Sequence, residues 1–419
     1  MSDSPDFFVT LLLNRERMAV ERTPNCSLRN RYHMYFSYTN ILPVVWICLG
    51  VAAICLIYLL TVYYLFIRIR YGRPKASAED KLPGVSVIVY ARDNATDLRS
   101  TLPEILGQDY PEDKMEVIVV NDGSVEDVTD VVNYLGAEHH NLYITFVPDD
   151  AHNLSRKKLA ISLGVKAAHN EVVILTCAEC HPASPSWLRQ MATPFATRGA
   201  KVVLGWAYIA GLKSSALRFD QAARGVEWLS AAVHHHPYRG TGYNLAYTRE
   251  AFFQAKGFSR SLNLTYGDDD IFINQIADGD NTSVVLSPDS IMQVEYKRPA
   301  AAYRDLRLRH CFTGRRLPKW SRRLMGSGTL AAWLWLAAVV TGTLFSLPNW
   351  GPASLLLATI PALWIPLTIC WRRTGRVLAI KLSPALIWWN MLWRWCGSIK
   401  CALLCTKSSR HNYTWHIKR

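Results

Sequence analysis

The sequence predicts an α/β fold, with a Rossmann-like, mostly parallel sheet and flanking transmembrane helices. Through the middle of the chain, short apolar runs typical of buried strands alternate with amphipathic segments. This alternation is typical of βαβ units, whose crossovers are right-handed. Long and almost uncharged apolar stretches lie before and after this region, and they are long enough to cross a bilayer as helices.

The composition fits a soluble domain joined to membrane segments. Of 419 residues, 50% are apolar and 19% are charged, and the formal net charge is +14. Such a charge favours a partner that carries phosphate, or a membrane surface. Because the basic residues lie beside apolar segments, we expect membrane lipids as partners and no nucleic acid. The ten cysteines are scattered, several within apolar runs, which indicates small buried residues and no disulfide framework.

The first apolar stretch, 41–67, is the expected transmembrane helix 1, and residues 1–40 form an N-terminal extension. Four basic residues follow it at once: Arg68, Arg70, Arg73 and Lys75. The positive-inside rule places this flank in the cytosol. We do not expect a cleaved signal peptide, since the apolar run is too long and begins too late.

A soluble domain is expected over 82–323. Its strands are predicted at 85–90, 115–120, 142–147, 172–175 and 201–205. Its helices are predicted at 96–106, from the turn after Ser124 to about 135, at 155–168 and at 219–233. Each strand is followed by a helix or by small polar residues, as a parallel sheet requires.

Two further spans are expected at 329–345 and 355–371, separated by a turn rich in proline. Arg372, Arg373 and Arg376 follow them and indicate a second cytosolic flank. The segment 377–404 mixes apolar residues with tryptophans and charges, which suits an interfacial helix, while a fourth span is the alternative. Residues 405–419 form a basic cytosolic tail. The chain is therefore expected to be an integral membrane protein with its soluble domain in the cytosol.

Several candidate binding residues follow the predicted strands directly. In open α/β sheets, ligands bind beyond the carboxyl ends of the strands. Ala91 and Arg92 follow the first strand, Asp122 follows the second in Asn-Asp-Gly-Ser, and Glu179 follows the run 172–175. A carboxylate there can hold a metal ion or a sugar-phosphate, although Asp-Gly is also a common turn. Mg²⁺ and Mn²⁺ prefer oxygen ligands, so Glu179 is the candidate metal ligand.

Three adjacent carboxylates, Asp268, Asp269 and Asp270, form the other strong signal. Because they repel one another, burial is expected to raise the pKa of at least one of them. The spaced ligands of a calcium loop are missing. A glycine-rich stretch, 237–247, precedes them, and the histidines 234–236 before it are expected to form a polar helix end.

Taken together, these motifs resemble the membrane-anchored family 2 glycosyltransferases, which have the GT-A fold. The resemblance covers about 82–320 and includes the strand and loop 85–94, the Asp122 motif, the Cys-x-Pro-x-x-x-x-Trp-Leu tail at 180–188 and the glycine-rich loop. In this family two aspartates that flank one residue bind the metal. Here Cys177 replaces the first aspartate, and Glu179 stands at the second position.

The resemblance also implies roles for individual residues. Asp269 would be the catalytic base and Asp268 its support, while Glu179 would hold Mg²⁺ or Mn²⁺. Donor binding would fall to Ala91, Arg92, Asp122, Lys157 and Arg309, and the acceptor or donor-sugar loop would include Gly242 and Asn244. The alternative for Lys157 is a solvated helix face, and for Arg309 a basic belt on anionic lipid.

The implied activity is that of an inverting hexosyltransferase of family 2. It would move a sugar from a nucleotide-sugar donor to a lipid-linked or surface-glycan acceptor, as in polysaccharide biosynthesis. The family's processive members carry Gln-x-x-Arg-Trp, whereas Leu306 and His310 replace the glutamine and the tryptophan here, so we expect a non-processive enzyme. The alternative is a catalytically degenerate homologue that acts as a scaffold in glycan assembly. A transporter is disfavoured because the spans lack buried ionisable residues.

Overall fold

A computed structural model describes residues 43–63, 82–125, 127–148, 155–347, 350–394 and 396–397. The expected extension 1–40 and the basic tail 405–419 lie outside these residues. The chain divides into two compact units. One comprises residues up to Thr61 together with Leu330–Trp364, and the other comprises Val62–Thr329 together with the chain from Ile365.

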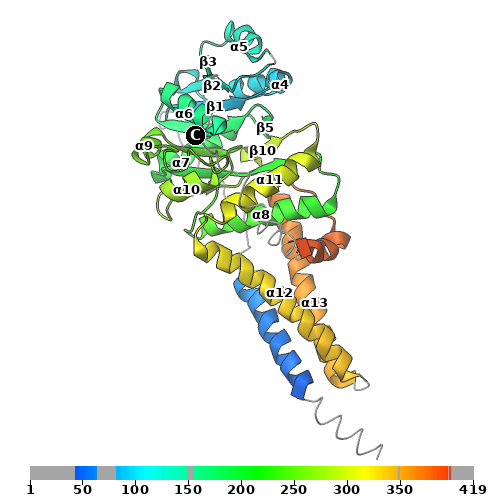
Figure 1. Cartoon of the computed structure of the whole chain (residues 1–419). Helices are drawn as coiled ribbons and strands as arrows, with labels where there is room; N and C mark the ends of the chain where they lie inside the picture. The colour runs from blue at the N-terminus through cyan, green and yellow to red at the C-terminus, as the bar shows by residue number, and fades with distance from the viewer. Residues whose placement is uncertain are drawn as a thin grey trace, which may run out of the picture. The chain divides into compact units, whose positions relative to one another are not determined.

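The larger unit contains a seven-stranded sheet with the order β3-β2-β1-β4-β8-β6-β9 (Figure 1). The strand β8 runs antiparallel to both β4 and β6, and the other neighbours run parallel. The predicted Rossmann-like, mostly parallel sheet is therefore confirmed. The strands are β1 (Val85–Ala91), β2 (Met115–Asn121), β3 (Leu142–Phe146), β4 (Val172–Cys177), β6 (Val202–Gly205), β8 (Leu245–Thr248) and β9 (Thr282–Val285).

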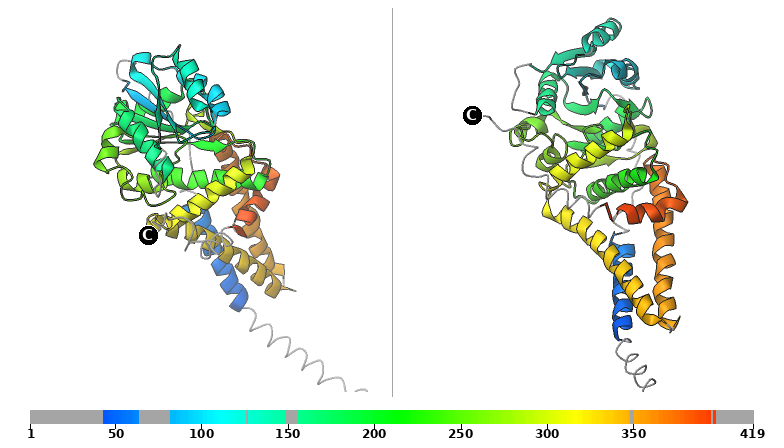
Figure 2. Two further views of the ribbon diagram at one scale, coloured as in Figure 1. Left: turned by 45° about the horizontal axis from the view of Figure 1, so that its top comes forward. Right: turned by 45° about the vertical axis from the view of Figure 1, so that its right-hand side comes forward.

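Helices cover both faces of this sheet (Figures 1 and 2). The apolar sides of α4 (Ala95–Leu106), α5 (Val128–Gly136) and α7 (Trp187–Arg198) share one buried core with β1 and β2. The helix α6 (Arg156–Ala167) packs on the other face, where Gly164 permits close approach: a Cβ there would lie 2.7 Å from Cγ2 of Ile88. The short helices are α9 (Arg249–Gln254) and α10 (Asp270–Ile276), and the 3₁₀ turns are Glu112–Lys114, Pro288–Ser290 and Pro384–Leu386.

A small second sheet begins directly after Glu179. Here Cys180–Pro182 forms the strand β5, and a turn that contains Pro185 follows it. The strand β5 pairs with β10 (Met292–Val294), which also pairs with β7 (Ala207–Ile209). Proline is tolerated because β5 is an edge strand. Glu179 is thus held in a two-residue turn between two strands.

The helices α8 (Ser215–Val233) and α11 (Pro299–Gly314) lie side by side (Figures 1 and 2). They are joined at Asp220, whose buried carboxylate accepts hydrogen bonds from Tyr303 at 2.8 Å and pairs with Arg307 at 2.9 Å. The C-terminal segment reaches the same site, since Nε of Arg394 lies 3.4 Å from Asp220. Within the segment 377–404, Lys381, Asn390 and Arg394 contact residues of α8, and Trp389 is exposed.

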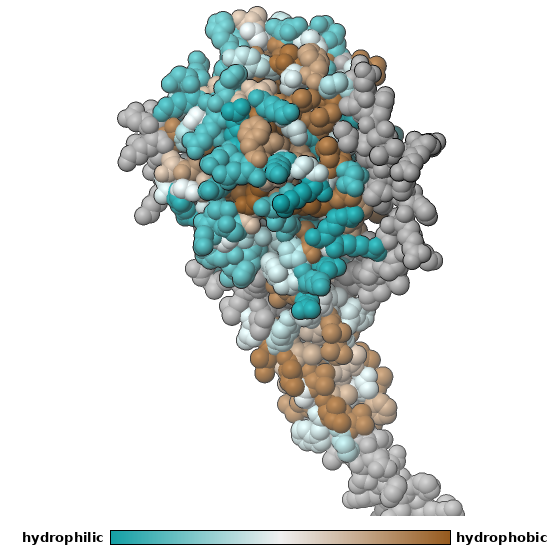
Figure 3. Space-filling view, turned by 60° about the vertical axis from the view of Figure 1, so that its left-hand side comes forward, coloured by the Kyte–Doolittle hydropathy of each residue, from teal (hydrophilic) through white to brown (hydrophobic). Residues whose placement is uncertain are grey.

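Three helices are long and apolar enough to cross a membrane: Pro43–Thr61, α12 (Lys319–Ser346) and α13 (Trp350–Val377). Together with the π-helical turn Leu59–Tyr63, they contain the described part of the expected 41–67 span and the expected spans 329–345 and 355–371. Within the smaller unit they pack closely at Gly342, where a Cβ would lie 2.6 Å from Leu356 and 2.8 Å from Cys48. On the face shown in Figure 3, apolar residues dominate these helices, whereas polar residues dominate the α/β domain.

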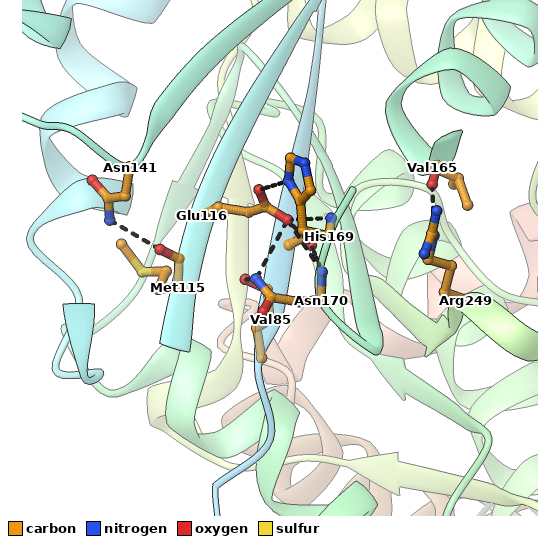
Figure 4. A network of polar contacts seen from close by, with 9 residues as sticks. Val85, Met115, Glu116, Asn141, Val165, His169, Asn170 and Arg249 are labelled. Carbon is orange, nitrogen blue, oxygen red and sulfur yellow. Dashed lines mark hydrogen bonds and ion pairs between the residues drawn. The ribbon is translucent and has the colours of Figure 1, made fainter. Parts of the chain in front are cut away.

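A polar network holds the amino-terminal ends of β1 and β2 (Figure 4). The carboxylate of Glu116 accepts hydrogen bonds from Ser86 at 2.5 Å and from the backbone N–H of His169 at 2.7 Å, and the ring of His169 lies 2.9 Å away. Burial opposes ionisation, but these hydrogen bonds lower the pKa of Glu116. The network lies at the strand ends opposite to the candidate site, so we assign it a structural role.

Candidate active site

Two loops beyond the carboxyl ends of β1 and β2 form one wall of the site. The N–H of Asp122 donates to the carbonyl of Ala91 at 2.9 Å. Asp93 links the loops twice: its N–H donates to Oγ of Ser124 at 3.0 Å, and its carboxylate accepts the N–H of Val125 at 2.7 Å. The expected nucleotide-binding residues Ala91, Arg92 and Asp122 therefore lie on one braced surface.

Asp122 lies at the centre of this surface with a fully buried side chain. Oδ2 accepts a hydrogen bond from the hydroxyl of Tyr90 at 2.7 Å, and Oδ1 accepts one from Nε of Arg156 at 2.7 Å. The half-exposed guanidinium of Arg92 lies 3.5 Å away. Sequence reasoning missed Arg156, although it begins the Arg-Lys-Lys run in which Lys157 was singled out.

Lys157, the next residue of α6, does not lie on a solvated helix face. Its Nζ lies 2.9 Å from Oδ2 of Asp268, and only 22% of its side chain is exposed. The same ammonium lies 5.7 Å from the ring centroid of Tyr90 and 5.9 Å from that of Tyr243. Lys157 therefore connects the Asp122 surface with the acidic triplet.

The acidic triplet occupies the turn into α10. Gly267 precedes it with a φ of 102°, a conformation that favours glycine. Asp269 is the N-cap of α10: its Oδ1 accepts the N–H of Asp270 at 2.7 Å, and its Oδ2 accepts the N–H of Gly242 at 3.3 Å. The glycine-rich loop and the expected base are thus in direct contact.

The three carboxyl groups are electrostatically different. Burial, followed by the neighbouring Asp270 and Asp268, raises the pKa of Asp269 to about 7. Burial also opposes ionisation of Asp268, but the Lys157 ammonium and the Arg309 guanidinium outweigh it and lower the pKa of that carboxyl. Asp269 is therefore the member whose pKa is suited to proton transfer near neutral pH.

Asp270, which sequence analysis left without a role, is a structural anchor. Its fully buried carboxylate pairs with Nε of Arg239 at 2.9 Å and accepts a hydrogen bond from Oγ1 of Thr313 at 2.5 Å. Thr313 belongs to α11, so Asp270 joins the start of α10 to α11. The turn that carries Asp269 is fixed by this contact.

Asp269 lines a cavity of about 20 Å³, which is room for about one water molecule or one hydroxyl group. Arg309 of α11 also lines it; its guanidinium lies 2.6 Å from Asp305 and stacks 5.3 Å from the ring centroid of Tyr266. The cavity therefore brings the adjacent Asp268 and Asp269 together with Lys157, Gly242 and Arg309, which come from three other parts of the sequence.

Glu179 lines a second and larger cavity of about 520 Å³. Asn94 donates a hydrogen bond to Oε1 of Glu179 at 3.1 Å. Burial, followed by the charge of Asp97, raises the pKa of Glu179. The linings of the two cavities meet at a hydroxyl pair, since Oη of Tyr243 and Oη of Tyr296 are 3.0 Å apart. The cavity lining comprises Asp93, Asn94, Asp97, Glu179, Glu295, Tyr296, Lys297, Arg298, Ala301 and Ala302.

The residues around Glu179 fit a divalent cation only together with a substrate. Cys177 is buried and, as a soft ligand, suits Mg²⁺ and Mn²⁺ poorly. Within the described ranges, no three His, Cys, Asp or Glu side chains are grouped as a metal site. Hard divalent ions are commonly held by one or two carboxylates plus substrate phosphates, and Glu179 can supply one such carboxylate.

The two residues expected in the acceptor or donor-sugar loop, Gly242 and Asn244, have different surroundings. A Cβ on Gly242 would lie 3.6 Å from Oδ2 of Asp268, so this residue lies beside the acidic triplet. Asn244, in contrast, is fully buried: its Oδ1 accepts from Nε1 of Trp187 at 3.0 Å, and its Nδ2 donates to the carbonyls of Trp206 and Ser290. Its amide therefore holds the glycine-rich loop from behind.

The histidines 234–236 end α8, as expected. Rings of His234 and His235 lie within hydrogen-bond distance of the carbonyls of Ser230 and Gly279, at 2.7 and 2.6 Å. The ring of His236 packs 5.4 Å from that of Trp320. These contacts explain the three side chains without a metal ion.

The fold and the carboxylates beyond its strand ends define a GT-A glycosyltransferase domain. The mannosyltransferase PcManGT from Pyrobaculum calidifontis, solved with GDP-Man and Mn²⁺, shares this fold with a TM-score of 0.50 and 20% identity; the match covers 82% of this chain and 97% of that one. Residues 83–313 match the sequence model described as glycosyltransferase like family 2. The chain belongs to this family.

Two curated proteins are similar over shorter stretches. Probable glycosyltransferase YdaM of Bacillus subtilis is 30% identical over 103 residues, which are 24% of this chain and 24% of YdaM. Glycosyltransferase AglE of Haloferax volcanii is 23% identical over 124 residues, which are 30% of this chain and 39% of AglE. The matches thus span less than half of either relative.

Proposed function

We propose that the protein is an inverting glycosyltransferase that uses a nucleotide-sugar donor, and that Asp269 is its catalytic base. The observation that carries this proposal is the cavity in which Asp269 meets Arg309 and Lys157. It combines a carboxyl whose pKa is about 7 with two cations, next to the surface that holds Asp122. Such a pairing of base and cations suits the transfer of a sugar from a diphosphate.

In the proposed reaction, the carboxylate of Asp269 accepts the proton of the acceptor hydroxyl. The hydroxyl oxygen forms a bond to the anomeric carbon from the side opposite to the leaving group, which inverts the configuration. The bond from that carbon to the diphosphate oxygen breaks, and the electron pair stays on the nucleoside diphosphate. Arg309 and Lys157 offset the charge that develops there. A divalent ion held by Glu179 would supply further positive charge at the diphosphate.

Each residue group then has a place in substrate binding. Arg92, Arg156 and Asp122 would contact the nucleoside, and Gly242 would let the backbone approach the sugar. Mn²⁺ and a guanosine nucleotide-sugar are the ligands of PcManGT, which motivates testing both here. The replacements at Leu306 and His310 support a non-processive enzyme.

The acceptor is proposed to be a lipid-linked or surface glycan, as in polysaccharide biosynthesis. Three helices are apolar enough to anchor the chain in a membrane, and Arg372, Arg373 and Arg376 follow the third expected span. By the positive-inside rule, these arginines support a cytosolic position of the α/β domain. The exposed Trp389 and Trp393 suit an interfacial position of the C-terminal segment.

Calorimetry with the detergent-solubilised full chain tests the proposal. UDP-, GDP- and dTDP-sugars are titrated with and without Mn²⁺, and released nucleotide is measured for each donor. We expect metal-dependent binding of one nucleotide class, followed by turnover of one of its sugars.

The second candidate is a scaffold without turnover, and it is favoured by Cys177 at the metal motif and by Leu306. It predicts no binding of any donor under either condition. Binding without turnover in the presence of a glycolipid extract would also support it. The buried carboxylates favour the enzyme, because burying several acids is costly for a protein that does not use them.

A further inference from the structure

Lys158 is a fully buried cation that the proposed reaction does not use. Its Nζ donates hydrogen bonds to three backbone carbonyls, those of Ser261 at 2.6 Å, Leu264 at 3.1 Å and Tyr266 at 3.0 Å. An ammonium group has three N–H donors, so these carbonyls match its capacity. The hydroxyl of Ser261 lies at a longer 3.3 Å.

The three carbonyls belong to the segment that leads directly into Gly267 and the acidic triplet. Most of this segment is built from turns, so its carbonyls require partners from elsewhere. Ser155, at the start of α6, supplies two further hydrogen-bond donors. Its N–H donates to the carbonyl of Leu262 at 3.3 Å, and its hydroxyl donates to the carbonyl of Thr265 at 3.1 Å. The first turn of α6 thus holds five carbonyls of residues 261–266.

The same turn of α6 contacts the other parts of the site. Arg156 pairs with Asp122 on the nucleotide surface, and Lys157 pairs with Asp268. Three consecutive basic residues therefore contact three parts of the site. Arg156 contacts Asp122, Lys157 contacts Asp268, and Lys158 contacts the segment that leads to Asp269.

We propose that Lys158 is a positioning residue, which fixes the segment 261–266 and thereby places Asp269 relative to the donor-binding surface. The proposal rests on the proposed function of Asp269. Without the ammonium, the carbonyls of Ser261, Leu264 and Tyr266 lose this donor, and the segment must shift to find water or other partners. A shift of about 1 Å at a reacting group can lower the rate about 100-fold while binding elsewhere is unaffected.

The electrostatic setting agrees with this role. Burial lowers the pKa of Lys158 to about 8, while the charges of Asp268 and Asp269 favour its protonated form. The side chain therefore keeps its three N–H donors at neutral pH.

The test compares Lys158→Met with Lys166→Met in the full chain in detergent. Lys166 is exposed on the same helix and serves as the matched control. We measure the Kd of the free diphosphates UDP, GDP and dTDP, turnover of the donor found active in the wild type, and amide hydrogen exchange. For Lys158→Met we expect amide exchange to be about tenfold faster in 258–270 and unchanged in β1 and β2. We expect kcat to fall about 10- to 100-fold, whereas the nucleotide Kd and the donor KM should stay within about threefold of the wild-type values. Lys166→Met should match the wild type.

Lys158→Gln keeps an amide donor and should recover part of the kcat and of the protection; it also replaces Lys158→Met as the test variant if the latter does not fold. Unchanged exchange in 258–270 would overturn the proposal, and so would loss of nucleotide binding in proportion to turnover. If no donor binds the wild type, the proposed function fails separately, and hydrogen exchange alone then decides whether Lys158 fixes the segment.

Discussion

Nζ of Lys157 lies 2.9 Å from Oδ2 of Asp268, so the cation expected at the diphosphate is paired with the neighbour of the proposed base. This ion pair joins α6 to the acidic turn. It also lowers the pKa of Asp268 and opposes the rise in the pKa of Asp269. A diphosphate that draws Lys157 away would make both carboxyl groups more basic.

Replacing this cation should change the pH dependence of turnover. In Lys157→Met, we expect the acidic midpoint of the kcat profile to move to higher pH, because the acidic pair loses its nearest positive charge. The nucleotide Kd should also rise if Lys157 binds the diphosphate. Lys166→Met, on the exposed face of the same helix, should change neither quantity. An unchanged midpoint would show that Lys157 has no influence on the base.

Asp269→Asn should lose about 100- to 10,000-fold in kcat, the range expected for removal of a general base. The amide keeps the shape of the side chain, so nucleotide binding should be retained. Calorimetry and donor turnover measure the two effects. Asp113→Asn, at an exposed acid on a 3₁₀ turn, is the control. Full turnover in Asp269→Asn would remove this residue as the base.

Turnover of the wild type should rise with pH through about pH 7, since only the ionised carboxylate of Asp269 can accept a proton and its pKa is raised to about 7. Stability should respond in the opposite direction. The pKa of Asp269 is higher in the folded protein than in the unfolded chain. The contribution of this group to the free energy of unfolding therefore falls as the pH rises from the unfolded pKa to the folded pKa of about 7. A profile that is flat between pH 5.5 and 8.5, roughly the range around this pKa, would contradict the assignment.

Glu179→Gln should weaken the metal dependence of nucleotide binding by about tenfold or more, because an amide oxygen is a poorer ligand for a hard cation than a carboxylate. Calorimetry with and without Mn²⁺ gives the ratio. Glu295→Gln is the informative comparison, since Glu295 lines the same cavity. If both variants lose the same amount of metal dependence, the effect comes from the negative charge of the cavity in general, and Glu179 is not a specific metal ligand.

Asp220→Asn should destabilise the α/β domain by about 3–5 kcal/mol, because removing one partner of a buried ion pair leaves the other charge uncompensated. Arg307 would lose its ion pair with Asp220, whereas Arg394 would keep its contact with Glu227. The ion pair of the exposed Asp109 with the partly buried Arg189 offers a contrast: Asp109→Asn should cost less than about 1 kcal/mol. Thermal unfolding in one detergent compares the two variants, and similar midpoints would refute the argument.

The local pattern of apolar and polar residues determined most strands and helices of this protein. The apolar runs at 85–90, 115–120 and 172–175 are strands because residues of this type and spacing suit a sheet buried on both faces, and the helices between them follow from period and length. The candidate carboxylates Asp122 and Glu179 are recognisable because each follows a predicted strand, and Asp269 because it lies among three adjacent acids. The long apolar stretches likewise predicted three helices able to span a membrane.

Only the tertiary structure decided which of these residues meet. Arg156, Lys157 and Lys158 are neighbours in sequence, yet helical geometry directs them to different partners, and spacing alone does not identify those partners. Asn244 and Asp270 are polar residues near the site, but packing buries both and uses their polar groups for structure. The strand β5 depends on pairing with β10, more than 100 residues further along the chain. Such long-range contacts have no local signal, because they are set by the summed packing of the whole domain.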